Sequence, residues 1–122
     1  MREPRIAVTG VCASGKTTLT AGLTRLGYVA YSVPQEHSFV KRLWEKQHPD
    51  VNILVLLDAR YETTKRRRPE IAYGPERLEE QRARLATARE SCDLYLPTDD
   101  LTIEQVLETV VNWVEAWKER LA

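Results

Sequence analysis

The sequence predicts an α/β fold, a three-layer α/β/α sandwich built on a mostly parallel sheet of about four strands. Segments rich in strand-forming residues occupy 5–9, 28–33, 51–57 and 93–96, and helical patterns lie between them and after the last one. Strands that alternate with helices need right-handed crossovers, which make the strands parallel. The segment 51–57 is the most apolar of the four, as expected for a central strand covered on both faces.

About five helices are expected, over 18–26, 39–47, 61–68, 76–91 and 103–117. The first has leucines at helical spacing, and Gly27 follows it as a candidate for a left-handed cap. Pro75 suits the first position of the fourth helix. Thr102 and Gln105 match a capping box at the start of the last one.

Size and composition limit the classes of function. The length of 122 residues suits one domain, residues 1–122. Lys plus Arg and Asp plus Glu both number 18, which argues against a nucleic-acid groove. The sequence has no apolar stretch long enough for a membrane span, and we expect a cytoplasmic protein without a signal peptide. Cys12 and Cys92 lack metal-ligand spacing and are expected to be free thiols.

The most specific stretch is Gly10-Val11-Cys12-Ala13-Ser14-Gly15-Lys16-Thr17, which fits the phosphate-binding pattern G-x-x-x-x-G-K-[ST]. It lies between a predicted strand and a predicted helix, which is the context that this pattern requires. Glycines let the main chain approach phosphates closely, and the start of the helix adds a positive field. The residues expected to hold the phosphates are Gly10, Ala13, Ser14, Gly15, Lys16, Thr17 and Thr18.

Individual side chains of this loop have separate expected roles. Lys16 would reach the outer phosphates, and the Thr17 hydroxyl is an oxygen ligand of the kind that Mg²⁺ prefers. Cys12 is interpreted as a neutral part of the loop, and the alternative is a redox-sensitive thiol.

The chain resembles the P-loop small-molecule kinases, the group that contains nucleoside monophosphate kinases and shikimate kinase. The phosphate-binding pattern carries most of this resemblance. The segment from Leu57 to Arg67 is similar to the strand and helix that enter the family's lid, and the segment from Cys92 to Asp99 is similar to its last strand and adenine-side loop. The resemblance implies a P-loop NTPase fold that binds ATP, or another nucleoside triphosphate, with Mg²⁺. Compared with the family, this chain lacks one strand–helix unit before residue 51.

Two further site residues are expected. Glu36 and Asp58 each follow a predicted strand, and either carboxylate would hold Mg²⁺ or orient an acceptor. Glu36 is preferred because it resembles the acidic residue after an inner strand of nucleoside kinases. The family pattern also favours Arg67 as the cation that stabilises transferred charge; the alternative is a solvated basic helix end. His37 is interpreted as a polar contact, with acid–base catalysis as the alternative.

These features lead to two hypotheses about function. In the first, the chain is a kinase that transfers the γ-phosphoryl group of Mg·ATP to an unidentified small acceptor, with Lys16, Glu36 and Arg67 as catalytic residues. In the second, it is a nucleotide-binding sensor or a slow NTP hydrolase that acts with a partner. A regulatory GTPase is a weaker idea, because the sequence has no Asn-Lys-x-Asp motif.

Overall fold

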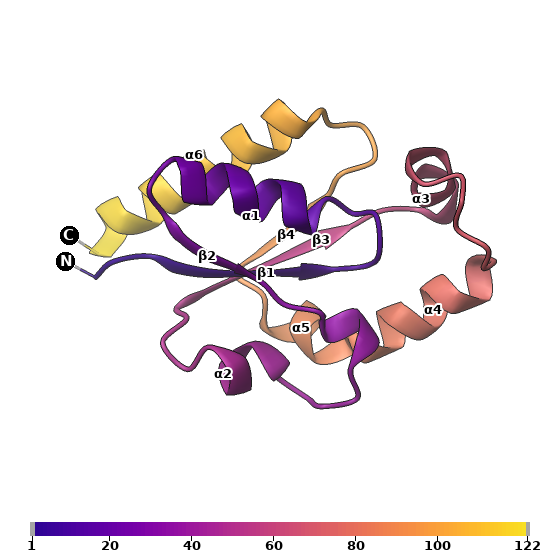
Figure 1. Cartoon of the computed structure of the whole chain (residues 1–122). Coiled ribbons are helices and arrows are strands. Elements are labelled where there is room, and N and C mark those ends of the chain that lie inside the picture. The colour runs from indigo at the N-terminus through magenta and orange to yellow at the C-terminus, as the bar shows by residue number, and fades with distance from the viewer. Residues whose placement is uncertain (1, 122) are drawn as a thin grey trace.

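The computed structural model describes residues 2–121 and has helices on both faces of a four-stranded parallel sheet (Figure 1). The strands are β1 (Arg5–Gly10), β2 (Val29–Ser32), β3 (Ile53–Asp58) and β4 (Leu94–Pro97). The helices are α1 (Lys16–Arg25), α2 (Leu43–Gln47), α3 (Tyr61–Arg67), α4 (Pro75–Arg84), α5 (Ala86–Ser91) and α6 (Ile103–Leu121), and a 3-10 turn, η1, covers Gln35–His37. The expected α/β sandwich with a parallel sheet is confirmed.

The strands lie in the order β2-β1-β3-β4, and each neighbouring pair is parallel. In the β1–β3 pair Val8 lies opposite Val55. Parallel strands end at the same edge, so the loops after all four strands gather at one side of the molecule. Figure 1 shows these loops together with α3 at the end of the sheet opposite the two chain termini.

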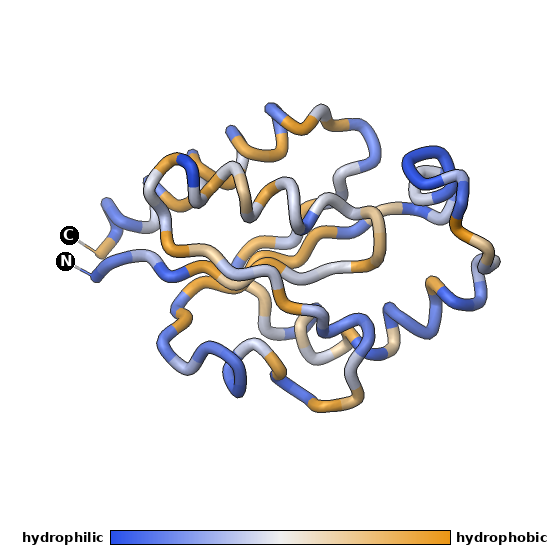
Figure 2. The backbone as a smooth tube through the Cα atoms, in the orientation of Figure 1, coloured by the Kyte–Doolittle hydropathy of each residue, from blue (hydrophilic) through white to orange (hydrophobic). Residues whose placement is uncertain are grey.

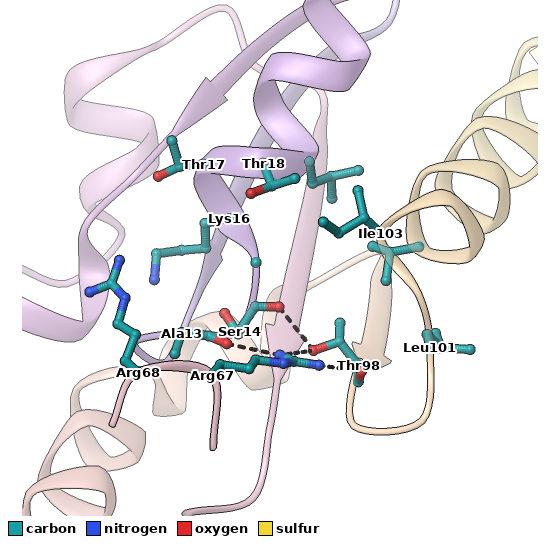
Figure 3. Close-up of a pocket in the computed structure, with 13 residues that line it drawn as sticks. Ala13, Ser14, Lys16, Thr17, Thr18, Arg67, Arg68, Thr98, Leu101 and Ile103 are labelled. Carbon is teal, nitrogen blue, oxygen red and sulfur yellow. Dashed lines mark hydrogen bonds between the residues drawn. The ribbon is translucent and has the colours of Figure 1, made fainter. Parts of the chain in front are cut away.

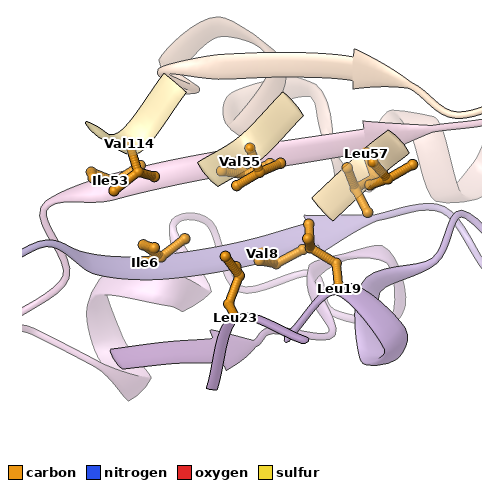
Figure 4. Packing of buried hydrophobic residues seen from close by; sticks show 10 residues of the cluster. Ile6, Val8, Leu19, Leu23, Ile53, Val55, Leu57 and Val114 are labelled. Carbon is orange, nitrogen blue, oxygen red and sulfur yellow. The ribbon is translucent and has the colours of Figure 1, made fainter. Parts of the chain in front are cut away.

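Two apolar clusters hold the layers together, one on each face of the sheet. Alternate residues of the two central strands divide between them: Ile6 and Val8 pack under α1 and α6, whereas Ala7 faces the opposite layer. Figure 4 shows the first cluster, in which Leu23 and Val114 join the strand side chains. Figure 2 shows mostly hydrophobic residues in the central strands, mostly hydrophilic residues in α4, and an alternation of both kinds along α6. Coverage on both faces explains why 51–57 is so apolar.

The features that the sequence predicts at the ends of helices are present in the structure. Gly27 has φ of +93° after α1, in the left-handed region. Thr102 and Gln105 exchange hydrogen bonds: the Thr102 amide donates to Gln105 Oε1 at 2.9 Å, and the Gln105 amide donates to Thr102 Oγ1 at 3.1 Å. Pro75 begins α4. Within the described residues, no helix combines the length and the apolar content that crossing a membrane requires.

Two helices differ from the expectation. The segment 39–47 is helical only in α2, because Arg42 adopts a φ of +57° and Phe39 is 84% exposed instead of packed. The segment 76–91 divides into α4 and α5 at Leu85, whose amide lies 3.1 Å from the carbonyls of both Gln81 and Arg82. Leu85 is buried at this junction. Local periodicity therefore located the helical regions but not the changes of direction inside them.

The packing of α6 gives a test of the first apolar cluster. Val110 is fully buried against the sheet, whereas Glu108 of the same helix is exposed. We expect Val110→Ala to lower the free energy of unfolding by about 2 kcal/mol, from lost burial and the cavity left behind. Glu108→Ala should change it by less than about 0.5 kcal/mol. Urea unfolding followed by circular dichroism measures both, and equal effects would contradict the assigned helix face.

Candidate functional site

A pocket of about 440 Å³ opens at the carboxyl edge of the sheet (Figure 3). It lies where the start of α1, the end of α3 and the segment from β4 into α6 meet. The helix start and two arginines give one side of it a positive character, and α6 and its approach supply apolar side chains. The lining residues are Ala13, Ser14, Gly15, Lys16, Thr17, Thr18, Leu19, Arg67, Arg68, Thr98, Leu101, Ile103 and Val106.

The backbone of the loop between β1 and α1 takes positive φ angles that few residue types other than glycine adopt. Gly10 has φ of +155°, and a Cβ there would lie 2.2 Å from the Leu57 carbonyl oxygen. Gly15 at the helix start has φ of +107°, and Ala13 takes φ of +61°. Because Gly10 lies so close to β3, the loop packs against the ends of the strands, and the start of α1 faces the pocket.

Lys16 is held over this loop by three acceptors. Its Nζ donates to the carbonyls of Gly10 and Val11, both at 3.0 Å, and lies 2.8 Å from Glu36 Oε2. Glu36 comes from η1, directly after β2, and its side chain is only 4% exposed. The structure therefore brings together the lysine and the preferred carboxylate, from segments twenty residues apart. Glu36 Oε1 is buried and has no hydrogen-bond partner.

Asp58, the other candidate carboxylate, lies elsewhere. Its Oδ2 accepts a hydrogen bond from the Tyr95 hydroxyl at 2.6 Å, and its Oδ1 accepts from the Ala59 amide at 2.9 Å and from Arg82 Nη2 at 3.4 Å. Burial, followed by the hydrogen bond and charge of Asp58, raises the pKa of Tyr95. Asp58 lines a separate cavity of about 140 Å³ with Arg82, Arg89 and Tyr95.

Arg67 lines the pocket but is also tied to the protein. Its Nη1 donates to the Ala13 carbonyl at 2.8 Å and to Thr98 Oγ1 at 3.0 Å, and its Nη2 donates to the Thr98 carbonyl at 2.6 Å (Figure 3). Partial burial, and then the neighbouring charge of Arg66, lower the pKa of Arg67, and Asp99 acts in the opposite direction. The guanidinium thus joins the loop after β1 to the end of β4. Arg68 also lines the pocket.

Sequence reasoning did not assign a side-chain role to Thr98. The residue is 1% exposed, and its hydroxyl donates to the Ser14 carbonyl at 2.9 Å while it accepts from Arg67. The sequence did contain one indication of this role, because Thr98 lies just after a predicted strand, at the edge of the sheet where ligands bind. Gln81 was missed as well: it is buried, and its Oε1 accepts from the Cys12 amide at 2.9 Å.

The cysteines and histidines take different positions. Cys12 and Cys92 are both free thiols, as expected. Cys12 Sγ lies 3.5 Å from His37 Nε2, so His37 makes the polar contact that the sequence analysis favoured. His48 lies away from this edge and stacks on Tyr31 with ring centroids 3.8 Å apart.

The chain was compared with protein families, with curated proteins and with solved structures. A scan against models of protein families and a search of curated protein sequences each found no match. Among solved structures, the chain is similar to the C-terminus of RcsC from E. coli, which contains a linker region and a phosphoreceiver domain. The TM-score is 0.50 at 17% identity, so the likeness shows the fold alone. It covers 97% of this chain and 48% of that one, so this chain spans about half of that neighbour.

This finding corrects the resemblance to P-loop small-molecule kinases. The RcsC structure contains a phosphoreceiver domain, and the order β2-β1-β3-β4 of this chain is the beginning of the flavodoxin-like order 2-1-3-4-5. The comparison therefore does not support a P-loop NTPase fold or ATP as a cofactor. It also does not support either expected function, the ATP-binding kinase or the alternative of a nucleotide-binding sensor or slow NTP hydrolase. The physical reason is that the motif specifies only a glycine turn between a strand and a helix, and it does not fix strand order or function.

Asp99, the residue after the pocket residue Thr98, contacts the start of α3. Its Oδ1 accepts hydrogen bonds from the Arg60 amide at 2.8 Å and from Thr63 Oγ1 at 2.6 Å. Burial by itself raises the pKa of Asp99, but the Thr63 and Arg60 hydrogen bonds and the Arg60 charge outweigh it and leave the pKa below its ordinary value. The carboxylate caps a helix whose own N-cap residue makes no side-chain cap.

A lowered carboxyl pKa predicts a pH-dependent contribution to stability. The contribution is fully present above the unfolded pKa of about 3.9 and is lost as pH falls through the lower folded pKa. We expect Asp99→Asn to lower the free energy of unfolding by about 1 kcal/mol at pH 7. This difference should shrink as pH drops below about 4.

Urea unfolding at a series of pH values measures this difference. Asp100→Asn is the matched control, because Asp100 is exposed in the next position. A difference between Asp99→Asn and the parent that stays constant from neutral to acid pH would rule out the carboxylate cap.

Proposed function

We propose that this chain is a phosphate-binding domain that holds the phosphoryl group of a small phosphorylated ligand over the loop from Gly10 to Thr17. The observation that supports it is the 440 Å³ pocket at the start of α1, which Lys16, Arg67 and Arg68 line. Backbone N–H groups at a helix start and nearby cations attract anions. The apolar part of the ligand would lie against Leu101 and Ile103.

In this proposal the binding residues are Gly10, Ala13, Ser14, Gly15, Lys16, Thr17 and Thr18. The glycines keep the main chain close, the amides and the Lys16 ammonium contact phosphate oxygens, and Arg67 supplies positive charge at the rim. When the ligand binds, the Lys16 ammonium would leave Glu36 and contact a phosphate oxygen of the ligand instead. Lys16 and Arg67 would act on any phosphoryl group that reacts in the pocket, because both favour charge on its oxygens.

Mg²⁺ fits the oxygen donors that lie beside this loop. The Thr17 hydroxyl lines the pocket, and Glu36 offers a buried carboxylate oxygen without a hydrogen-bond partner. Hydroxyl and carboxylate oxygens are ligands that Mg²⁺ accepts. We therefore assign Thr17 and Glu36 as the proposed magnesium ligands. When bound, the cation would neutralise charge on phosphate oxygens.

Removal of the lysine tests phosphate binding directly. We expect Lys16→Ala to raise the Kd for pyrophosphate at least tenfold, which corresponds to about 1.4 kcal/mol, because a charge-assisted contact is lost. Isothermal titration calorimetry with pyrophosphate measures the affinity. Lys41→Ala removes an exposed lysine and should leave the Kd unchanged. If both variants bind pyrophosphate as tightly as the parent, the proposed site is wrong.

A second candidate function is acceptance of a phosphoryl group by Asp58. The structural neighbour contains a phosphoreceiver domain, and Asp58 lies at the end of β3 in its own cavity with Arg82 and Arg89. Its side chain is 22% exposed. A carboxylate oxygen would attack phosphorus of a donor such as acetyl phosphate. The bond from phosphorus to the acetate oxygen would break, acetate would leave with the electron pair, and the arginines would hold the new charge.

Mass spectrometry of the intact protein tests this second function. Incubation with acetyl phosphate and Mg²⁺ should add the mass of one phosphoryl group to the parent and to Glu36→Gln. The added mass should be absent from Asp58→Asn, which lacks the acceptor oxygen. An unmodified parent, or modification that persists in Asp58→Asn, would reject Asp58 as the acceptor.

A further inference from the structure

Three potential metal ligands of different types meet beside the phosphate loop, and one of them, Glu36, is shared with the proposed phosphate site. Cys12 comes from the loop after β1, and Glu36 and His37 come from η1 after β2. Because β1 and β2 are neighbouring parallel strands, their following segments lie at the same edge. One ligand atom from each of the three residues lies within 4.8 Å of the other two.

Two of the three distances between the ligand atoms match a tetrahedral cation site. Cys12 Sγ lies 3.5 Å from His37 Nε2, which in turn lies 3.6 Å from Glu36 Oε2. Bonds of about 2.0 to 2.3 Å to a tetrahedral Zn²⁺ would separate neighbouring ligand atoms by roughly 3.3 to 3.6 Å. The remaining pair, Cys12 and Glu36, lies within 4.8 Å, and a bound cation would hold these two ligand atoms at a similar separation.

The surroundings of the cluster also point to a cation. The Glu36 side chain is only 4% exposed, and its Oε2 lies near both His37 Nε2 and Lys16 Nζ, whereas its other oxygen, Oε1, has no hydrogen-bond partner. His37 is 54% exposed and leaves a path from solvent. Gln81 supports the cysteine from behind: its Nε2 lies 3.3 Å from Cys12 Sγ, and its Oε1 accepts from the Cys12 amide. Such outer contacts hold a ligand in position.

We propose that Cys12, Glu36 and His37 form a binding site for a thiophilic divalent cation of the Zn²⁺ class, with three protein ligands and one position open to solvent. Thiolate, imidazole and carboxylate together are a ligand set for zinc, and the thiolate disfavours Mg²⁺. Binding displaces the thiol proton to solvent. The cation takes the Glu36 oxygen that Lys16 contacts at 2.8 Å, so the ammonium competes with it.

Cobalt is the probe, because Co²⁺ occupies zinc sites and its spectrum reports thiolate ligation and tetrahedral geometry. Titration of the reduced, full chain should give a thiolate-to-cobalt charge-transfer band and intense visible bands. Addition of Zn²⁺ should remove them. We expect Cys12→Ser to abolish the charge-transfer band and His37→Ala to weaken cobalt binding at least about tenfold.

The chain supplies its own matched controls, because it has two cysteines and two histidines. Cys92→Ser and His48→Ala should keep the parent spectrum and affinity. The His37 side chain is mostly exposed, so His37→Ala tests the site even if Cys12→Ser unfolds. A parent without a charge-transfer band, or equal effects of His37→Ala and His48→Ala, would overturn the proposal and leave only a hydrogen-bonded cysteine–histidine pair.

Lys16→Ala separates this inference from phosphate binding. Loss of the competing ammonium should tighten cobalt binding, whereas the same variant should weaken pyrophosphate binding. Cobalt binding that weakens in Lys16→Ala would contradict the shared use of Glu36. Failure of pyrophosphate binding in the parent, with the cobalt spectrum intact, would reject the proposed function and leave the metal site standing.

Discussion

At the edge of the sheet where the strands end, the arrangement of the loops depends on the buried hydroxyl of Thr98. It donates to the Ser14 carbonyl and accepts from Arg67, so it fastens the loop after β1, the end of α3 and the end of β4 to one another. These segments are far apart in the chain and share no continuous secondary structure. Hydrogen bonds in a water-poor setting are costly to leave unmade, so the three segments keep one relative arrangement. The pocket walls are therefore built from helix ends and from the loops that join them to the sheet, and not from the strands.

The sheet nevertheless decides which loops can meet. Its order brings the loops after β1 and β2 side by side, which joins Lys16 to Glu36 and Cys12 to His37. Asp58 ends the other neighbour of β1 but turns toward Tyr95 and Arg82. Two carboxylates at equivalent places in the sequence pattern consequently have different surroundings. Glu36 faces a lysine and a histidine, whereas Asp58 faces a phenol and a guanidinium.

Regular structure was readable from the sequence because burial leaves a periodic pattern. The apolar run of β3, the glycine after α1 and the Thr102–Gln105 cap were all predictable, since each depends on residues within a few positions. The contact of Lys16 with Glu36, the role of Thr98 and the cap that Asp99 supplies to α3 join residues far apart in the chain. The family resemblance was wrong for the same reason: the loop motif is local, whereas strand order is a property of the whole chain.

The pairing of Lys16 with Glu36 has a consequence for selectivity. The ammonium already has a carboxylate as counter-ion and two carbonyl acceptors, so Lys16 itself adds little uncompensated charge to the pocket. In the proposed phosphate site an anion would therefore have to replace this carboxylate as the partner of Lys16. A multiply charged phosphate would compete with the carboxylate better than chloride, which carries a single charge. The buried glutamate would thus favour ligands of high charge density in the proposed site.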